Sequence, residues 1–286
     1  MSGMIPRPAE GTAQLVDRAA TPPSIRSTIE ALATYRHLLR NLVSKDLKLK
    51  YRGSVFGFLW SLANPLLMIV VYTIAFTYIL QIRSEGFVFY LMLGILAWTF
   101  FAGSLSAATG SIADNGGLVK SVFFPRAILP LATVLFNLSQ YLLTIVVFLP
   151  FMLLYYGIAP AAPMLLFPVF LLLQLVFTVG LALLLATATA FFRDVKHLVE
   201  VGLAALFWLT PIVYHLDDIA RRSPGAARLL TFSPMAPYIT AYHDIFFDRV
   251  WPDPLTWTLA IGYAAAALVI GLLVIVRHDE QFAERV

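Results

Sequence analysis

The sequence contains no cysteine, and only 13% of its 286 residues are charged. The absence of cysteine excludes disulfide bonds, thiol catalysis and thiolate-bound metals. The low charge is equally restrictive, because soluble domains carry about 25% charged residues. With 60% hydrophobic residues and a mean hydropathy of +0.82, the composition argues against a soluble globule, a disordered chain and a disulfide scaffold. An integral membrane protein remains.

Long stretches of the chain lack Asp, Glu, Lys, Arg and His altogether. One of them runs for 66 residues, from Ala127 to Phe192, which is enough for two helical spans of about 20 residues each with a turn at Gly157 and Pro160. The fifth uncharged stretch is short, which indicates a tilt, a kink at Pro211 or a half-helix. Together the stretches predict an all-α membrane protein with six transmembrane helices, near residues 55–80, 88–113, 128–156, 165–192, 198–215 and 254–276.

The basic residues are distributed unevenly between the two sides that six spans define. Of the 20 lysines and arginines, 15 fall on the side that the two termini share, so the positive-inside rule places both termini in the cytoplasm. The formal net charge of +4 is therefore interpreted as setting topology, and no nucleic-acid partner is expected. Residues 1–29 are polar and punctuated by proline, and we expect a mobile cytoplasmic tail there, followed by one transmembrane domain over 30–286.

Residues 34–50 have the periodicity of an amphipathic helix. Basic residues fill one side, and apolar residues recur every three or four positions on the other, at Tyr35, Leu38, Leu39, Leu42 and Val43. A basic amphipathic helix just before a membrane span is expected to lie flat in the interface. The alternative, a helix packed on a soluble core, is disfavoured because no such core is encoded nearby.

The segment 216–253 is neither a plain loop nor a full span. It contains two short apolar stretches, 226–232 and 238–247, among four prolines. These stretches predict two short outer helices that are re-entrant, dipping into the outer leaflet. An amphipathic loop lying on the lipid surface is the alternative.

Several kinds of chemistry are missing from the sequence. The predicted spans hold almost no ionisable group, which disfavours an ion-coupled transporter. No G-x-S-x-G or H-E-x-x-H pattern occurs, and no lysine follows a glycine, which excludes a G-x-x-x-x-G-K-[ST] nucleotide loop. We therefore expect no catalytic residue, no metal site and no cofactor in this chain. Such a protein is either a passive channel or the partner of a separate ATPase.

One stretch has the appearance of a known family. Residues 42–76 read LVSKDLKLKYRGSVFGFLWSLANPLLMIVVYTIAF, with a pattern formed by Asp46, Lys48, Lys50, Tyr51, Arg52, Ser54, Gly57, Trp60 and Pro65. The stretches DNGGLVKSVFFPRAILP (114–130), FFRDVKHLVEVGLAALFWLTPIVY (191–214) and SPMAPYITAYHDIFF (233–247) agree in order and spacing. From about residue 30 onward the chain resembles the permease subunit of type-2 ABC exporters, which export bacterial polysaccharides such as O-antigen, teichoic acid, capsule and galactan.

The resemblance implies partners, a substrate and a location. Two copies of the chain would pair with two ATPase subunits, which bind the ATP and Mg. A lipid-linked polysaccharide would cross the bacterial inner membrane through a channel between the two permease copies, and the short outer helices would form a gate. The interface helix would lie near the point of substrate entry, with Arg40, Lys45, Asp46, Lys48, Lys50, Tyr51 and Arg52.

A channel for a long glycan is expected to use aromatic rings, because they bind the CH faces of sugars without trapping a sliding chain. The candidates in the first and fifth spans are Trp60, Tyr72, Phe76, Trp208 and Tyr214. Aromatic belts facing lipid are the alternative for about half of them. Trp98 and Trp257 are expected to be belt residues.

The loop after the second predicted span is expected to couple the chain to its ATPase. Asp114 or Asn115 would cap a short helix, and Gly116 and Gly117 permit the turn into it. Apolar side chains exposed there would be costly without a partner. The coupling residues are predicted to be Asn115, Gly117, Val119, Lys120, Val122, Phe123, Phe124 and Arg126, with Arg193 and Asp194 forming either a local charge network or a second contact.

Two other functions compete with polysaccharide export. One is the export of a small molecule, such as a drug, a lipid or haem, on the same permease scaffold. The other is a membrane-embedded acyl- or glycosyltransferase, which the absence of acids and bases within the spans opposes.

Overall fold

The computed structural model describes residues 25–53, 59–79, 86–121 and 124–279. Within these ranges every regular element is a helix. Four helices are long and apolar enough to cross a membrane: α5 (Phe87–Gly110), α7 (Ile128–Tyr155), α8 (Phe167–Phe191) and α13 (Pro254–His278). They confirm four of the six predicted spans, with bounds that differ by a few residues. Gly157, with φ +63°, forms the turn between α7 and the short helix η3 (Ala162–Leu166).

The first and fifth predicted spans are built differently. Helix α4 (Leu59–Thr73) continues directly into a π-helix, η1 (Ile74–Ile79). Helix α9 (Val195–Leu209) has 15 residues, about 22 Å at 1.5 Å per residue, which is less than the ~30 Å hydrocarbon core. It ends at Leu209, so Pro211 follows the helix instead of kinking it, as expected from the clash between proline and a preceding helical residue. These two spans therefore stay predictions.

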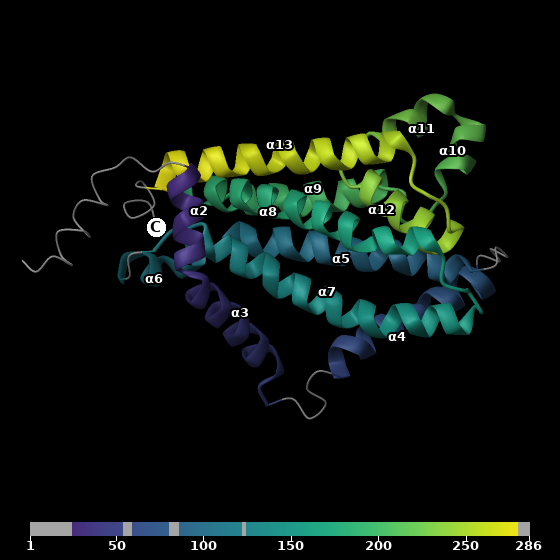
Figure 1. The fold of residues 1–286 in the computed structure, drawn as a ribbon, viewed down its shortest axis with the longest axis horizontal. Helices are drawn as coiled ribbons and strands as arrows, with labels where there is room; N and C mark the ends of the chain where they lie inside the picture. The colour runs from purple at the N-terminus through teal and green to yellow at the C-terminus, as the bar shows by residue number, and fades with distance from the viewer. Residues whose placement is uncertain (1–24, 54–58, 80–85, 122–123, 280–286) are drawn as a thin grey trace, which may run out of the picture.

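The long helices form a bundle with two distinct ends (Figure 1). Helices α8 and α13 lie side by side, and α5 packs against α7, α8 and α9. One end, which we call the terminal end, holds α2 (Ile25–Thr34), α6 (Gly116–Ser121) and the last turn of α13. The opposite, distal end holds α10 (Leu216–Arg222), α11 (Pro224–Thr231) and α12 (Ala236–Tyr242).

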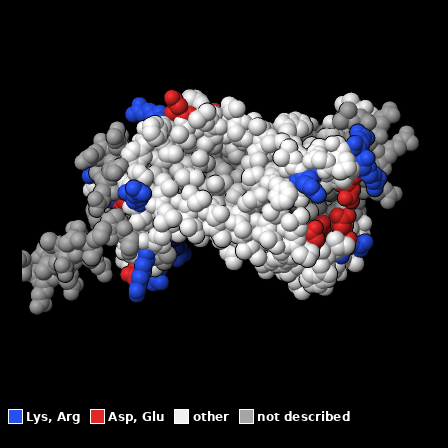
Figure 2. Space-filling model, turned by 90° about the horizontal axis from the view of Figure 1, so that it is seen from above, with Lys and Arg blue, Asp and Glu red and all other residues white. Residues whose placement is uncertain are grey.

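The charged residues gather at these two ends. Figure 2 shows Lys, Arg, Asp and Glu at both ends of the molecule and a broad uncharged belt between them. A belt of this kind is what the hydrocarbon core of a bilayer requires, because each buried charge in lipid costs several kcal/mol (about 2.5 or more). The protein is therefore a multi-pass membrane protein.

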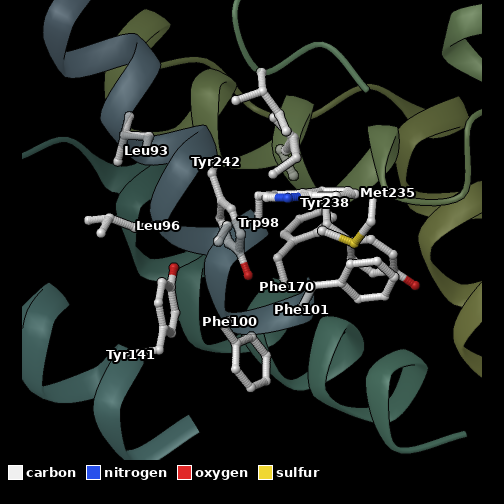
Figure 3. Packing of buried hydrophobic residues seen from close by; sticks show 14 of the residues in the cluster. Leu93, Leu96, Trp98, Phe100, Phe101, Tyr141, Phe170, Met235, Tyr238 and Tyr242 are labelled. Carbon is white, nitrogen blue, oxygen red and sulfur yellow. The ribbon is translucent and has the colours of Figure 1, made fainter. Parts of the chain in front are cut away.

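The core of the bundle is dense in aromatic rings (Figure 3). Phe101 stacks on Phe177 with ring centroids 5.6 Å apart, and Phe177 stacks on Tyr238 at 5.3 Å. Phe101 and Phe170 have no exposed surface. Lipid tails are as apolar as these rings, so the helices associate through close packing rather than through exclusion of water.

The closest backbone approach joins α8 and α13. A Cβ added to Gly180 would overlap the backbone of Ala267 and Leu268, and one added to Gly271 would overlap the carbonyl group of Gly180. Only glycine fits at these two positions. The sequence did not single them out, because neither lies in a spaced glycine pair within its own helix.

Two amphipathic helices pack on the terminal end. Helix α3 (Arg36–Tyr51) matches the predicted interface helix, but its apolar side packs against α7 and a hydrophobic cluster at the terminal end rather than on lipid alone. Helix α2 begins at Ile25, inside the range expected to be a mobile tail, and it packs against α13. Residues 1–24 lie outside the described residues, so the tail itself stays a prediction.

The distal segment contains one helix more than predicted. Helices α11 and α12 match the two apolar stretches, and α12 continues into a π-helix, η4 (His243–Asp248). Helix α10 was not predicted. Helix α12 packs against α5, α8 and α13, which differs from a loop on the surface of the molecule. Its depth in a bilayer stays a prediction.

Candidate functional site

A groove with a volume of about 420 Å³ lies between α5 and α9. The groove is lined by Trp98, Ala102 and Ser106 from α5 and by Glu200, Leu203, Ala204, Phe207 and Trp208 from α9.

Three aromatic rings form one side of the groove. The Trp98 ring meets Phe207 at 5.6 Å in an edge-to-face arrangement, and Phe207 meets Trp208 at 5.4 Å in the same way. Trp208 is 67% exposed, whereas Trp98 is only 8% exposed. The expectation that Trp98 is a lipid-facing belt residue is wrong, because α9 covers it. The sequence could not show this cover, which comes from a helix about 100 residues away.

The end of α9 is held by two tyrosines. The Tyr214 hydroxyl donates to the carbonyl oxygen of Trp208 at 3.0 Å, and the Tyr90 hydroxyl donates to the carbonyl oxygen of Tyr214 at 3.0 Å. The structure thus brings together two predicted channel residues, Trp208 and Tyr214. Tyr90 was missed, since nothing in the sequence separates it from other aromatic residues of α5.

The predicted channel residues of α4 and η1 lie elsewhere. The ring of Phe76 contacts Tyr72 at 6.1 Å and Phe87 at 5.2 Å, and neither of these contacts belongs to the α5–α9 groove. The side chain of Trp60 lies outside the described residues. Phe87 in turn stacks on Tyr90 at 6.4 Å, and Tyr90 bonds to Tyr214, so the two groups of candidate channel rings are connected indirectly within one chain.

The predicted coupling residues divide into buried and exposed ones. Val119 is 4% exposed and Phe124 is 1% exposed, and both belong to the hydrophobic cluster of the terminal end with Ile128 and Ile275. The exposure expected of Phe124 is wrong, because Phe124 and Val119 fasten α6 and the following turn to the bundle. Asn115, Gly117 and Lys120 are exposed on η2 (Ala113–Asn115) and α6. Val122 and Phe123 lie outside the described residues.

The polar side chain at the start of this loop has a different role from the one expected. The Asn115 amide donates to the carbonyl oxygen of Ser111 at 2.8 Å, beyond the last turn of α5. It therefore satisfies a carbonyl group at the end of α5 instead of capping α6.

Arg126 is tied within the chain. Its guanidinium lies 3.4 Å from the carboxylate of Asp279, just beyond α13, and the two side chains are 10% and 27% exposed. The expectation that Arg126 contacts an acidic group of a partner stays untested. The observed pair links the segment before α7 to the end of α13.

Removing this ion pair should weaken the permease itself. We expect Arg126→Gln and Asp279→Asn each to lower the midpoint of thermal unfolding of the purified chain by a few degrees, because each leaves a partly buried group without its charged partner, at a cost of about 1–3 kcal/mol. Arg26→Gln removes an exposed pair with Glu30 and serves as the control. An unchanged unfolding midpoint in both variants would contradict an internal tether.

Arg193 and Asp194 occupy the exposed turn between α8 and α9. The ion pair found nearby in the described residues joins His197 to Glu200 at 3.7 Å, when the histidine is protonated. The predicted local network around Arg193 and Asp194 is not seen in the described part of the chain, so both side chains face outward at the terminal end.

The basic residues of α3 differ in their surroundings. Arg40, Lys45 and Lys48 are exposed, as is Arg52 just beyond the helix, whereas Asp46 is half-buried. The Lys50 ammonium donates to the side chain of Gln140 in α7 and lies 5.9 Å from the centre of the Phe136 ring. Burial lowers the pKa of Lys50. The side chain of Tyr51 lies outside the described residues.

Comparison with known proteins identifies the family. The family model described as ABC-2 type transporter matches residues 37–247, so the chain belongs to this family. A Myxococcus xanthus protein named "O-antigen export system permease protein RfbA" is 34% identical over 261 residues, which cover 90% of this chain and 98% of that protein. A Klebsiella pneumoniae protein of the same name is 31% identical over 249 residues, covering 86% of this chain and 94% of that protein.

The resemblance inferred from the sequence is thus confirmed at the level of the family. The chain is a membrane subunit of a transporter rather than a catalytic protein. Among the described residues, no group of three or more His, Asp or Glu side chains could hold a metal ion.

Proposed function

We propose that the chain is the permease subunit of an ATP-driven exporter that moves lipid-linked polysaccharide across the bacterial inner membrane. The main support is the pair of relatives named as O-antigen export permeases, which align over 98% and 94% of their own lengths. The sequence adds that energy must come from another polypeptide, since it has no nucleotide-binding loop. Two ATPase subunits would supply it by binding ATP and Mg.

The transport path is proposed to form between two copies of the chain. Helix α9 carries an outward face on which Leu198 and Val201 are each 70% exposed and Trp208 is 67% exposed. Gly202 lies on the same helix with open space around it. A second copy facing α9 would bring its own aromatic groove and its α4 opposite the first, which would join the two groups of rings into one channel.

The chemistry of the groove suits a neutral, hydroxyl-rich chain. The rings of Trp208 and Phe207 offer faces for the CH groups of a sugar. Ser106 and Glu200 line the same groove and can exchange hydrogen bonds with hydroxyl groups. Few strong charges are present to hold a moving substrate in place.

The ATPase is proposed to dock on the terminal end. There η2, α6 and the α8–α9 turn expose Asn115, Gly117, Lys120, Arg193 and Asp194. Because Val119 and Phe124 fix α6 to the cluster that also includes α13, a push on α6 would be transmitted to the bundle as a rigid movement.

The test is reconstitution of the permease with its co-purifying ATPase in proteoliposomes. We expect lipid-linked glycan to stimulate ATP hydrolysis and glycan to become protected inside the vesicles only when ATP is present. An ATPase with its nucleotide-loop lysine replaced by alanine is the control. Glycan movement by the permease alone, or no association with an ATPase, would contradict the proposal.

A further inference from the structure

The distal segment between α9 and α13 divides into two parts with different contacts. Helix α12 and η4 form a buried part, in which Tyr238, Ile239 and Ile245 have no exposed surface. Helices α10 and α11 form an exposed part, in which only Ala227 is buried. The family resemblance implied that both short outer helices act as a gate. In the structure, one of them is buried in the bundle and the other is exposed.

The buried part is held by side-chain hydrogen bonds to three long helices. The Tyr242 hydroxyl donates to Gln174 of α8 at 2.7 Å, and the Tyr238 hydroxyl donates to the carbonyl oxygen of Ala260 of α13 at 2.9 Å. The His243 ring nitrogen Nε2 lies 3.0 Å from the carbonyl oxygen of Tyr90 of α5. All three bonds are buried.

Gln174 connects the buried part to two helices at once. Its side chain is fully buried, its oxygen accepts from Tyr242, and its amide donates to the carbonyl oxygen of Ala97 of α5 at 3.0 Å. Breaking the hydrogen bonds of such a buried amide is costly, because polar groups away from water would then be left unpaired. Figure 3 shows Tyr242 pointing into the core beside Trp98 and Tyr141.

The exposed part has a narrow base. The chain leaves α9 at Thr210 and returns at Ser233, and the hydroxyls of these two buried residues lie 3.3 Å apart. One further bond secures the returning end, in which the Tyr263 hydroxyl donates to the carbonyl oxygen of Phe232 at 2.8 Å, in an exposed position. Between these points, α10 packs chiefly on α11.

We infer that residues 216–232 form a hinged flap over the distal end, whereas α12 and η4 stay fixed, with Gln174 and Tyr242 as positioning residues. The base of the flap is formed by the joined residues Thr210 and Ser233 and by Tyr214, whose carbonyl oxygen accepts from Tyr90 of α5. The outer anchor of the flap is the Tyr263 hydroxyl. The proposed function is needed only to say what cargo passes the flap. The division into a movable and a fixed part is a property of the isolated fold.

Amide hydrogen exchange of the full chain in lipid nanodiscs tests this division with two matched variants. In the native chain, amides of 216–231 should exchange at least about tenfold faster than those of 236–248, because few buried contacts hold the flap. Tyr242→Phe removes one hydroxyl and should speed exchange about fivefold or more in 236–248 only. Tyr263→Phe removes one hydroxyl at the flap and should speed exchange in 216–231 only.

Two results would overturn the inference. One is equal exchange of the two segments in the native chain. The other is Tyr242→Phe loosening both segments to the same extent, which would mean that they open as one unit. If Tyr242→Phe does not fold, Tyr238→Phe replaces it, since it removes the other buried hydroxyl of α12, which donates to the carbonyl oxygen of Ala260 of α13.

A disulfide at the base gives an independent test. The chain has no cysteine of its own, and the hydroxyl oxygens of Thr210 and Ser233, which two sulfur atoms would replace, lie 3.3 Å apart. Oxidising Thr210→Cys/Ser233→Cys should leave exchange in 216–231 fast and leave ATP-driven export unchanged. Slow exchange in the flap, or export reduced tenfold by oxidation and restored by reduction, would contradict a fixed base. If the reduced protein exports nothing, the proposed function fails while the exchange result still decides the inference.

Discussion

Replacing Gly180 or Gly271 with alanine is expected to destabilise the permease by about 3 kcal/mol or more. A glycine-to-alanine change inside an exposed helix usually stabilises it by about 0.5–1 kcal/mol, so the expected effect has the opposite sign. The added methyl group would overlap backbone atoms of the facing helix, which no change of rotamer relieves. Helices α8 and α13 would have to separate along their length.

Thermal unfolding of the purified chain, followed by tryptophan fluorescence, measures this effect. We expect the midpoint to fall by about 10 °C, together with a loss of the monodisperse peak in size-exclusion chromatography. Gly262→Ala in the same helix α13 is the matched control, because nothing lies within 4 Å of its added Cβ. Equal midpoints for Gly180→Ala and Gly262→Ala would show that α8 and α13 are not in close contact.

Replacing Trp208 with alanine is expected to slow the export of long polysaccharide about tenfold, which corresponds to roughly 1.4 kcal/mol in the barrier. The ring is 67% exposed, so little packing is lost and the folded chain should keep its stability. What is lost is a face on which sugars can stack in the groove between α5 and α9.

Glycan transport into proteoliposomes at matched protein levels checks this prediction. Trp251→Ala is the control, because Trp251 is 62% exposed but lies outside the groove. Slower export in both variants would indicate a general effect of lost tryptophan, and native rates in Trp208→Ala would return Trp208 to the lipid-facing belt.

The amphipathic helix at 34–50 shows what the periodicity of apolar residues can and cannot predict. The spacing of Leu38, Leu39 and Leu42 located α3 and its apolar side within two residues. The sequence could not predict what this apolar side packs against, because the spacing of apolar residues is the same whether a helix rests on lipid or on other helices. Packing against the cluster of α6 and α13 decided the matter.

The coupling loop shows the same limit for burial. The sequence identified a short helix after α5 with apolar residues, and α6 is found there. It predicted exposure for Phe124, because a loop between spans ordinarily meets water, and gave Val119 only as a coupling residue. Both side chains are buried. Their burial depends on nearby Ile128 and also on Ile275 of α13, which lies about 150 residues further along the chain and meets them only after the bundle has formed.

The sequence by itself determined that this is a membrane protein, where four of its spans lie, and which family it belongs to. These properties can be predicted from short segments of the sequence. Long uncharged runs mark the spans, because lipid excludes charge wherever a helix crosses it, and short ordered patterns mark the family. The tertiary structure alone decided that Gly180 meets Gly271, that Trp98 lies behind α9, and that Gln174 fastens Tyr242. Those contacts join residues far apart in the chain, and the helices are equally apolar on many faces, so only their packing selects which faces meet.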